Sequence, residues 1–161
     1  MERKMRRFRQ ELSENESLEI IKKGKYAVMA VAGDDNYPYA VPLNYDYANG
    51  YVYLHSASQG HKIDSLKKNP KCSLCIIDKD YVIHEKFTSY FRSVIAFGKA
   101  EFVTSEEAKI KALRLLCEKY SPVFNPADEI NKSLKSVTVI AIRLERITGK
   151  EAIELVRRRK M

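Results

Sequence analysis

The sequence predicts a mostly β (α+β) protein, in which a six-stranded antiparallel sheet curls into a barrel with flanking helices. Three observations support this class of fold. Apolar and polar residues alternate along most segments, short turns rich in Gly, Asn and Asp join them, and few stretches show helical spacing. No G-x-G-x-x-G motif follows a strand, which argues against a Rossmann-type nucleotide site. With 161 residues, the chain is expected to form a single domain over 1–161.

The first third of the chain contains one helix and three strands. Ser13 and Glu16 have the spacing of a capping box, which predicts a helix start, and Gly24 is expected to end that helix. Strands are expected over residues 26–31, 37–47 and 51–55. Turn residues at 33–36 and 46–50 separate them, and Asn49-Gly50 is a strong hairpin signal.

The rest of the chain alternates helices with longer strands. A helix is expected from about Lys62 to Asn69, where Pro70 ends it. Ser105 is expected to start a second helix. The remaining segments are a strand over 71–77, a polar and mobile connection over 78–86, a long strand over 87–103 with a bend at Gly98, and a last strand over 136–144.

The net charge of +8 is concentrated at the two ends of the sequence. Residues 1–12 carry five cations against two acids, and residues 149–161 carry five against two, so only +2 remains for the 136 residues between them. A nucleic-acid groove would place its basic stripe on the folded body, among aromatic residues. Two basic tails are more typical of solubility or loose electrostatic contact, so a nucleic-acid partner is not expected.

The expected compartment is the cytoplasm. No apolar run approaches the length needed to span a bilayer, and the N-terminal residues are charged rather than signal-like, so no membrane role is expected. An odd number of cysteines, three, argues against a disulfide framework. Cys72 and Cys75 lie three apart on an expected strand, so their sulfurs should point to opposite faces as core thiols. No metal site is expected.

The segment from His55 to Pro70 has the composition of an anion site. Ser56 and Ser58 supply hydroxyl groups in a loop, and a helix then begins near Gly60 with Lys62 in its first turn. The partial positive charge of a helix N-terminus and a lysine would together favour a phosphate. The alternative is that the serines are ordinary loop residues and Lys62 is solvated.

Several segments, in this order, resemble the FMN-binding split barrels, the pyridoxamine 5′-phosphate oxidase-like proteins, and among them the nitroimidazole-resistance proteins. The similarity covers roughly residues 25–153. The segments that carry it are Tyr37 to Tyr45, Val52 to Ala57, Gly60-His61-Lys62, Asn69-Pro70, Ser93 to Ala100, and Thr148 to Ala152.

The resemblance implies a six-stranded split barrel that binds FMN between the two subunits of a homodimer. It implies that residues 41–45 line the edge of the flavin ring, largely through backbone groups, and that 55–57 follow the ribityl chain and phosphate. It also implies that His61 acts near substrate or cofactor. The residues expected to bind the cofactor are Val41, Pro42, Leu43, Asn44, Tyr45, His55, Ser56, Ala57, His61, Lys62, Arg92 and Ser93, the last two from a neighbouring strand or subunit. Because the chain lacks Trp, any aromatic stacking on the ring would come from Tyr or Phe, such as Tyr45 or Phe91.

Two functions remain open at this point. The first is an FMN-dependent oxidoreductase that reduces nitro or other electron-poor small molecules. The second is a non-catalytic barrel that binds or senses flavin or haem, with His55, His61 or His84 as axial ligand. Vitamin B6 oxidation is not expected, because the Arg-rich substrate-phosphate set and the C-terminal Arg-x-x-x-His segment of the true oxidases are absent from the sequence.

Overall fold

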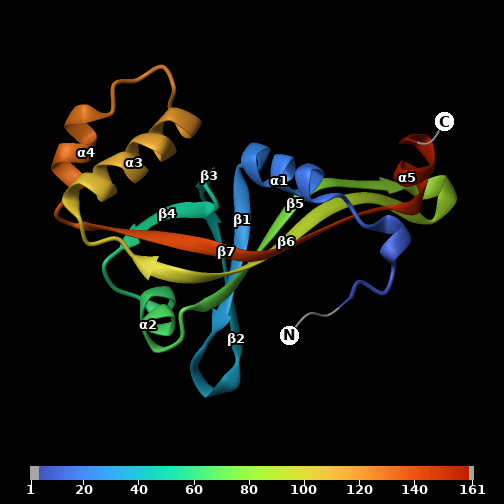
Figure 1. Ribbon diagram of the computed structural model, residues 1–161, viewed down its shortest axis with the longest axis horizontal. Coiled ribbons are helices and arrows are strands. Elements are labelled where there is room, and N and C mark those ends of the chain that lie inside the picture. The colour runs from blue at the N-terminus through green and yellow to red at the C-terminus, as the bar shows by residue number, and fades with distance from the viewer. Residues whose placement is uncertain (1–3, 160–161) are drawn as a thin grey trace.

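The computed structural model describes residues 4–159. Within them, one antiparallel sheet of seven strands is accompanied by five α-helices (Figure 1). The strands are β1 (Tyr26–Ala32), β2 (Pro38–Asn44), β3 (Asp46–Ala48), β4 (Tyr51–Ala57), β5 (Lys71–Ile83), β6 (Thr88–Phe102) and β7 (Val137–Glu151). The helices are α1 (Glu14–Lys23), α2 (His61–Lys68), α3 (Glu106–Tyr120), α4 (Ala127–Ser133) and α5 (Ile153–Arg159), with short 3₁₀ turns η1 (Phe8–Gln10), η2 (Asp34–Asn36) and η3 (His84–Lys86).

The strand order makes the sheet curl. It runs β2-β1-β5-β6-β7-β4-β3, so β2 and β3 form opposite edges. In the chain, however, only Tyr45 separates these two strands. The two edges must therefore approach each other at Tyr45, although within residues 4–159 no ladder of hydrogen bonds closes the ring. The result is an open, split barrel.

The expected count of six strands is wrong, because the predicted strand over 37–47 is two strands. β2 pairs with β1 up to Asn44, and β3 pairs with β4 from Asp46. Between them, the Tyr45 side chain is completely buried and its backbone N–H donates to the hydroxyl of Tyr120 at 3.0 Å. The chain thus changes its pairing partner within one residue, and alternation alone does not show such a change.

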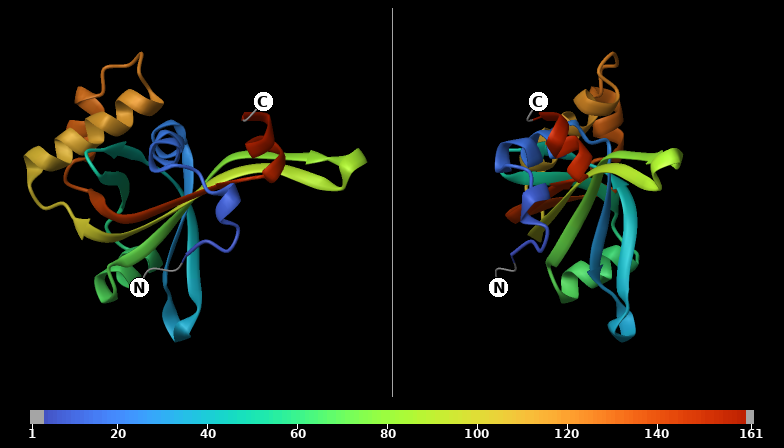
Figure 2. Two further views of the ribbon diagram at one scale, coloured as in Figure 1. Left: turned by 45° about the vertical axis from the view of Figure 1, so that its right-hand side comes forward. Right: turned by 90° about the vertical axis from the view of Figure 1, so that its right-hand side faces the viewer.

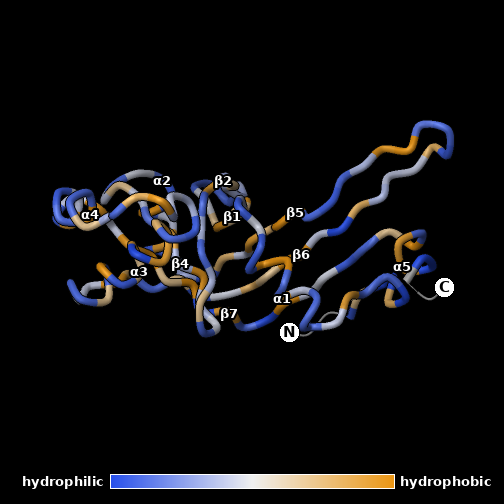
Figure 3. The backbone as a smooth tube through the Cα atoms, turned by 90° about the horizontal axis from the view of Figure 1, so that it is seen from above, coloured by the Kyte–Doolittle hydropathy of each residue, from blue (hydrophilic) through white to orange (hydrophobic). Residues whose placement is uncertain are grey.

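Other elements also differ from the expectation. The connection predicted over 78–86 is instead the end of β5, η3 and the start of β6, which form a two-stranded hairpin projecting from the body (Figures 2 and 3). Both faces of such a hairpin meet water, so its polar sequence resembles a loop. β7 continues past residue 144 to Glu151, and α4 and α5 were not predicted.

Other local expectations are confirmed. Ser13 and Glu16 form a reciprocal capping box at the start of α1, and this helix ends before Gly24. The register between β6 and β7 shifts at Phe97/Gly98, where a Cβ on Gly98 would lie 2.5 Å from the carbonyl oxygen of Arg143. Glycine is therefore required there for the close approach of the two strands.

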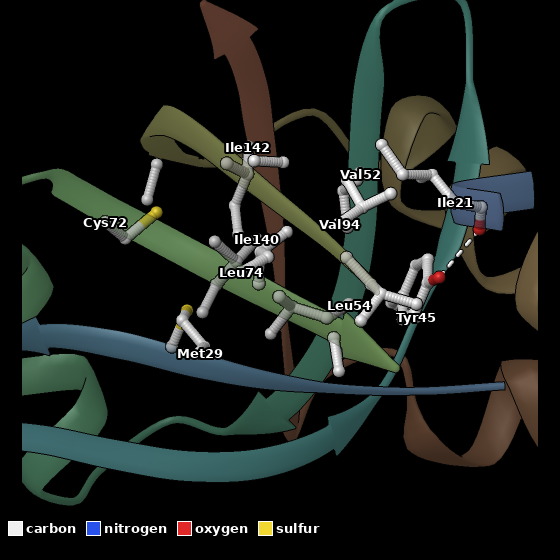
Figure 4. Packing of buried hydrophobic residues seen from close by; sticks show 14 of the residues in the cluster. Ile21, Met29, Tyr45, Val52, Leu54, Cys72, Leu74, Val94, Ile140 and Ile142 are labelled. Carbon is white, nitrogen blue, oxygen red and sulfur yellow. Dashed lines mark hydrogen bonds between the residues drawn. The ribbon is translucent and has the colours of Figure 1, made fainter. Parts of the chain in front are cut away.

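The main core lies inside the curled sheet (Figure 4). Its completely buried side chains come from most of the strands and include Met29, Val52, Leu54, Leu74, Val94, Ile140 and Ile142. Cys72 is buried on this face and Cys75 is half-buried on the other, so the predicted opposite orientation is confirmed. The expectation that both are core thiols holds for Cys72 alone. The Tyr45 hydroxyl donates to the Ile21 carbonyl oxygen at 2.6 Å, which attaches α1 to the core. Burial of this apolar surface is the dominant stabilising contribution.

The helices cover separate parts of the barrel. A second cluster, of Ala112, Leu113, Ile130 and Val139, packs α3 and α4 against the outer face of β7. α1 contacts β6 and β7, α2 contacts β1, and α5 lies beside η1 (Figure 1). Between residues 4 and 159, no helix combines the length and the apolar character needed to cross a membrane.

Candidate functional site

The start of α2 is arranged to receive an anion. Gly60 adopts φ 121°, a conformation that favours glycine, and no side chain caps the helix. Its carbonyl oxygen accepts from the N–H groups of Ile63 and Asp64. Within residues 4–159, the N–H groups of His61 and Lys62 are left without a backbone or side-chain acceptor, and they lie at the positive end of the helix dipole.

Lys62 adds a full charge to this helix start. Its side chain is half-buried, and burial lowers the pKa of the amine below its ordinary value. Among residues 4–159, no carboxylate forms an ion pair with it. A cation in the first turn of a helix is opposed by the dipole, and partial burial without a counter-ion is costly. An anion bound beside Lys62 would offset both costs.

His61 is held by two contacts on its own side of the barrel. Its ring stacks on Tyr39, with ring centroids 4.1 Å apart, and its Nε2 lies 3.5 Å from Oδ2 of Asp34. Asp34 also accepts from Lys68 Nζ at 2.9 Å, and this hydrogen bond lowers the pKa of the Asp34 carboxyl. Asp34 is not among the residues expected from the sequence, because nothing local marks a turn residue that contacts a helix 27 positions later.

The residues of β4 divide between the two faces of the sheet. Ser56 is half-buried, whereas His55 and Ala57 are exposed on the other face. His55 lines a pocket of about 380 Å³ between β4 and the α3–α4 pair. The other lining residues are Asn44, Leu113, Leu116, Cys117, Tyr120, Ser121, Glu129, Ile130, Ser133 and Val137. A mostly apolar pocket with a few polar groups is typical of a small-molecule site.

Residues 41–45 offer mainly backbone groups to a ligand. Val41 and Leu43 pack against the core, and Pro42 and Asn44 are exposed. The Asn44 amide donates to the carbonyl oxygen of Lys25 at 3.3 Å. The Tyr45 ring is completely buried and cannot stack on a flavin, so the suggestion of Tyr45 as a stacking residue is wrong.

Arg92 lies among carboxylates. Its guanidinium is 3.8 Å from Glu16 Oε1, 3.9 Å from Asp78 Oδ2 and 3.8 Å from Glu151 Oε2. Glu151 is only 2% exposed. These acids offset the positive charge of Arg92, which would otherwise be available to a phosphate. Ser93 is half-buried beside Arg92 and pairs with Ile77 of β5.

The structure therefore places six of the predicted residues in three separate groups. His61 and Lys62 lie at the start of α2, Asn44 and His55 line the α3–α4 pocket, and Arg92 and Ser93 lie along β6. Phe91, the other suggested stacking residue, lies with its ring centroid 5.0 Å from Lys150 Nζ. β6 extends from the body of the barrel toward the projecting hairpin, away from α2 (Figure 1).

An apolar row crosses the outer face of the sheet. In the strand register, Pro42, Val28, Cys75 and Ile95 are successive neighbours on β2, β1, β5 and β6. None of these four is fully buried, and Val28 is 40% exposed. Two further apolar side chains of the same strands are also exposed, Ile77 at 64% and Phe97 at 43%. We call these six residues the outer apolar face.

The open, curled antiparallel sheet is the architecture of the split β-barrels. The chain belongs to the pyridoxamine 5′-phosphate oxidase family, whose model matches residues 13–151. A structure described as a candidate 5-nitroimidazole antibiotic resistance protein from Bacteroides thetaiotaomicron is similar, with 25% identity and a TM-score of 0.75 over 88% of this chain and 86% of that one.

Two other solved structures share the fold. The flavocytochrome Anf3 from Azotobacter vinelandii has 20% identity and a TM-score of 0.75, over 92% of this chain and 72% of that one. An FAD- and haem-binding protein from Mycobacterium smegmatis has 17% identity and a TM-score of 0.74, over 89% and 73%. No curated protein matches the sequence.

Proposed function

We propose that the protein binds FMN and acts as an oxidoreductase that reduces small electron-poor molecules such as nitro-aromatics. The observation that carries the flavin proposal is the half-buried Lys62, which has no carboxylate partner among residues 4–159, at the uncapped start of α2. Membership of the pyridoxamine 5′-phosphate oxidase family and the flavin-binding structures that share the fold support it.

The chain would bind and orient the cofactor, and the flavin would supply the electron-transfer chemistry. Lys62 and the N–H groups of the first turn of α2 would hold the phosphate, and residues 41–45 would offer backbone groups to the ring. His61, oriented by Asp34 and Tyr39, would lie close to substrate. The pocket beside His55 would exclude water from a small, mostly apolar substrate.

A homodimer would complete the cofactor site. We expect a second copy of the chain to pack on the outer apolar face, because aligned apolar side chains are exposed there. Ser93 lies on the strand that carries Ile95 and Phe97 of this face. A second copy docked there would bring the β6 strand of one subunit toward the cofactor of the other.

The alternative function is a non-catalytic barrel that binds or senses flavin or haem. It is favoured by one observation, the exposed His55 at the edge of an apolar pocket, where an axial ligand would be accessible. A Soret band in the purified protein, lost on His55→Ala, would select this alternative. Steady NAD(P)H oxidation in the presence of a nitro-aromatic acceptor would select the enzyme.

The test of the cofactor is the visible spectrum of the purified protein, with mass analysis of what heat releases. We expect a flavin spectrum and released FMN. Lys62→Gln should weaken FMN binding at least tenfold in a fluorescence titration, whereas the matched control Lys67→Gln, an exposed lysine on the same helix, should not. Equal affinities for the two variants would contradict the phosphate site, provided that both have the circular dichroism of the wild type.

A further inference from the structure

The two basic tails of the sequence meet in the fold. Glu11 forms a β-bridge with Lys150, and the N–H of Leu12 donates to the carbonyl oxygen of Gly149 at 3.0 Å. α5, which follows β7, lies against η1 (Figures 1 and 2). Segments about 140 positions apart in the chain therefore form one end of the molecule.

This end gathers cations that lack acidic partners. Six of them are exposed, and in the part of the chain that the structure describes no carboxylate forms an ion pair with any of them. Arg92, by contrast, is surrounded by three carboxylates. We call these six residues the basic end: Lys4, Arg6, Arg7, Arg9, Arg157 and Arg158.

The side chains of the basic end suit phosphate groups. Five of the six are arginines, whose planar fork matches two phosphate oxygens. Phe8 lies among them, 67% exposed, with the Arg9 guanidinium 5.8 Å from its ring centroid. An exposed aromatic ring between cations is the arrangement on which an unpaired base stacks while its backbone is neutralised.

A lipid surface fits this end less well. In α5, Val156 is buried and Ile153 and Leu155 are half-buried against the body of the protein. The helix therefore presents arginines but no apolar face that could enter a bilayer, and Phe8 is the single large apolar side chain exposed within 4–12 and 149–158.

We propose that the basic end binds single-stranded nucleic acid through its phosphate backbone, with Phe8 as a stacking surface. A nucleic-acid partner was not expected from the sequence, because the excess positive charge lies in two tails that are far apart in the chain. In the fold these tails meet, so that objection no longer applies. Binding here does not depend on flavin, because none of these residues belongs to the candidate cofactor site.

The experiment measures fluorescence anisotropy of a labelled 20-nucleotide oligo(dT) with the full-length protein as purified. Four phosphate contacts would give a log–log salt slope of about −2.8, so affinity should fall about 50-fold between 50 and 200 mM salt. R6Q/R7Q and R157Q/R158Q should each lower the magnitude of the slope to about 1.4. Phe8→Ala should weaken binding without changing the slope.

The matched control is K111Q/R114Q, which removes the same charge from exposed positions on α3, at the other end of the molecule (Figure 1). It should leave the slope unchanged. If the control and the basic-end variants lower the affinity and the salt slope equally, the effect is one of net charge, and the proposal is overturned. Binding to phosphatidylserine vesicles without binding to the oligonucleotide would also overturn it, in favour of a lipid surface.

Discussion

The Tyr120 hydroxyl holds the backbone of Tyr45 at the point where the barrel is split. It accepts from the Tyr45 N–H at 3.0 Å and lies 2.7 Å from the Tyr45 carbonyl oxygen and 2.6 Å from that of Lys25, to either of which it can donate. The last residue of α3 thus joins the end of β2 to the start of β3. The hydroxyl thus fixes the backbone at the single residue through which the chain passes from one edge of the sheet to the other.

Tyr120→Phe should destabilise the fold by about 1–2 kcal/mol, because it leaves partly buried backbone groups without their partner. The measurement is urea unfolding followed by circular dichroism. Tyr37→Phe, which removes a hydroxyl from a 75% exposed ring, is the control and should change stability little. If Tyr120→Phe changes the free energy of unfolding no more than the control does, the hydroxyl does not hold the junction.

Asp34→Asn should weaken FMN binding severalfold, because it removes the carboxylate that orients His61 and accepts from Lys68. Asp35→Asn, one residue later and without an ion pair among residues 4–159, is the control. A fluorescence titration at several pH values reports the effect. Asp34 acts here as a positioning residue. An equal loss of FMN affinity after Asp34→Asn and Asp35→Asn would instead indicate a general effect of charge.

If the proposed homodimer forms, Phe97→Glu should convert it to monomer, because the substitution places a charge in the outer apolar face. Sedimentation velocity measures the change. Val123→Glu alters an 83% exposed residue in the loop between α3 and α4, away from this face, and should leave the dimer intact. A wild-type protein that is monomeric at micromolar concentration would contradict the proposed dimer directly.

Stability should fall at alkaline pH in part through Cys72. Burial raises the pKa of its thiol from an ordinary 9.0 to about 11. Above pH 9 the unfolded chain therefore loses this proton before the folded chain does, so the free energy of unfolding decreases as pH rises toward 11. Below pH 9 this contribution is fully present. Cys72→Ala should flatten the decline of the urea midpoint between pH 9 and 11, and an unchanged slope would contradict it.

The parts of the fold predictable from sequence are those with local chemical signals. The capping box at Ser13, the Asn49-Gly50 turn and the bend at Gly98 each depend on neighbouring residues, and each is confirmed. The exchange of partner strand at Tyr45 depends on a hydroxyl 75 positions away, which leaves no pattern in the sequence near it. The β5–β6 hairpin resembles a loop because water reaches both of its faces.

The residues of the candidate site also divide into those that local sequence could predict and those that it could not. The helix start at Lys62 was predictable, because glycine, hydroxyls and a cation are adjacent in the chain. Asp34 was not, since its contact with His61 exists only in three dimensions. The acids around Arg92 come from α1, β5 and β7, so its proposed role with the cofactor could not be judged from sequence. Tyr45 resembled a ring-stacking aromatic, but its position at the junction buries it.

The position of β7 also determines the order in which the molecule can be completed during synthesis. β3 and β4 pair with each other, and within residues 4–159 β4 joins the rest of the sheet only through β7, which begins 80 positions after β4 ends. Until Val137–Glu151 has left the ribosome, the β3–β4 hairpin has no other strand to pair with. Its apolar face, which includes Val52 and Leu54, stays exposed in the nascent chain. Arresting translation before residue 137 should therefore yield a chaperone-dependent, aggregation-prone intermediate.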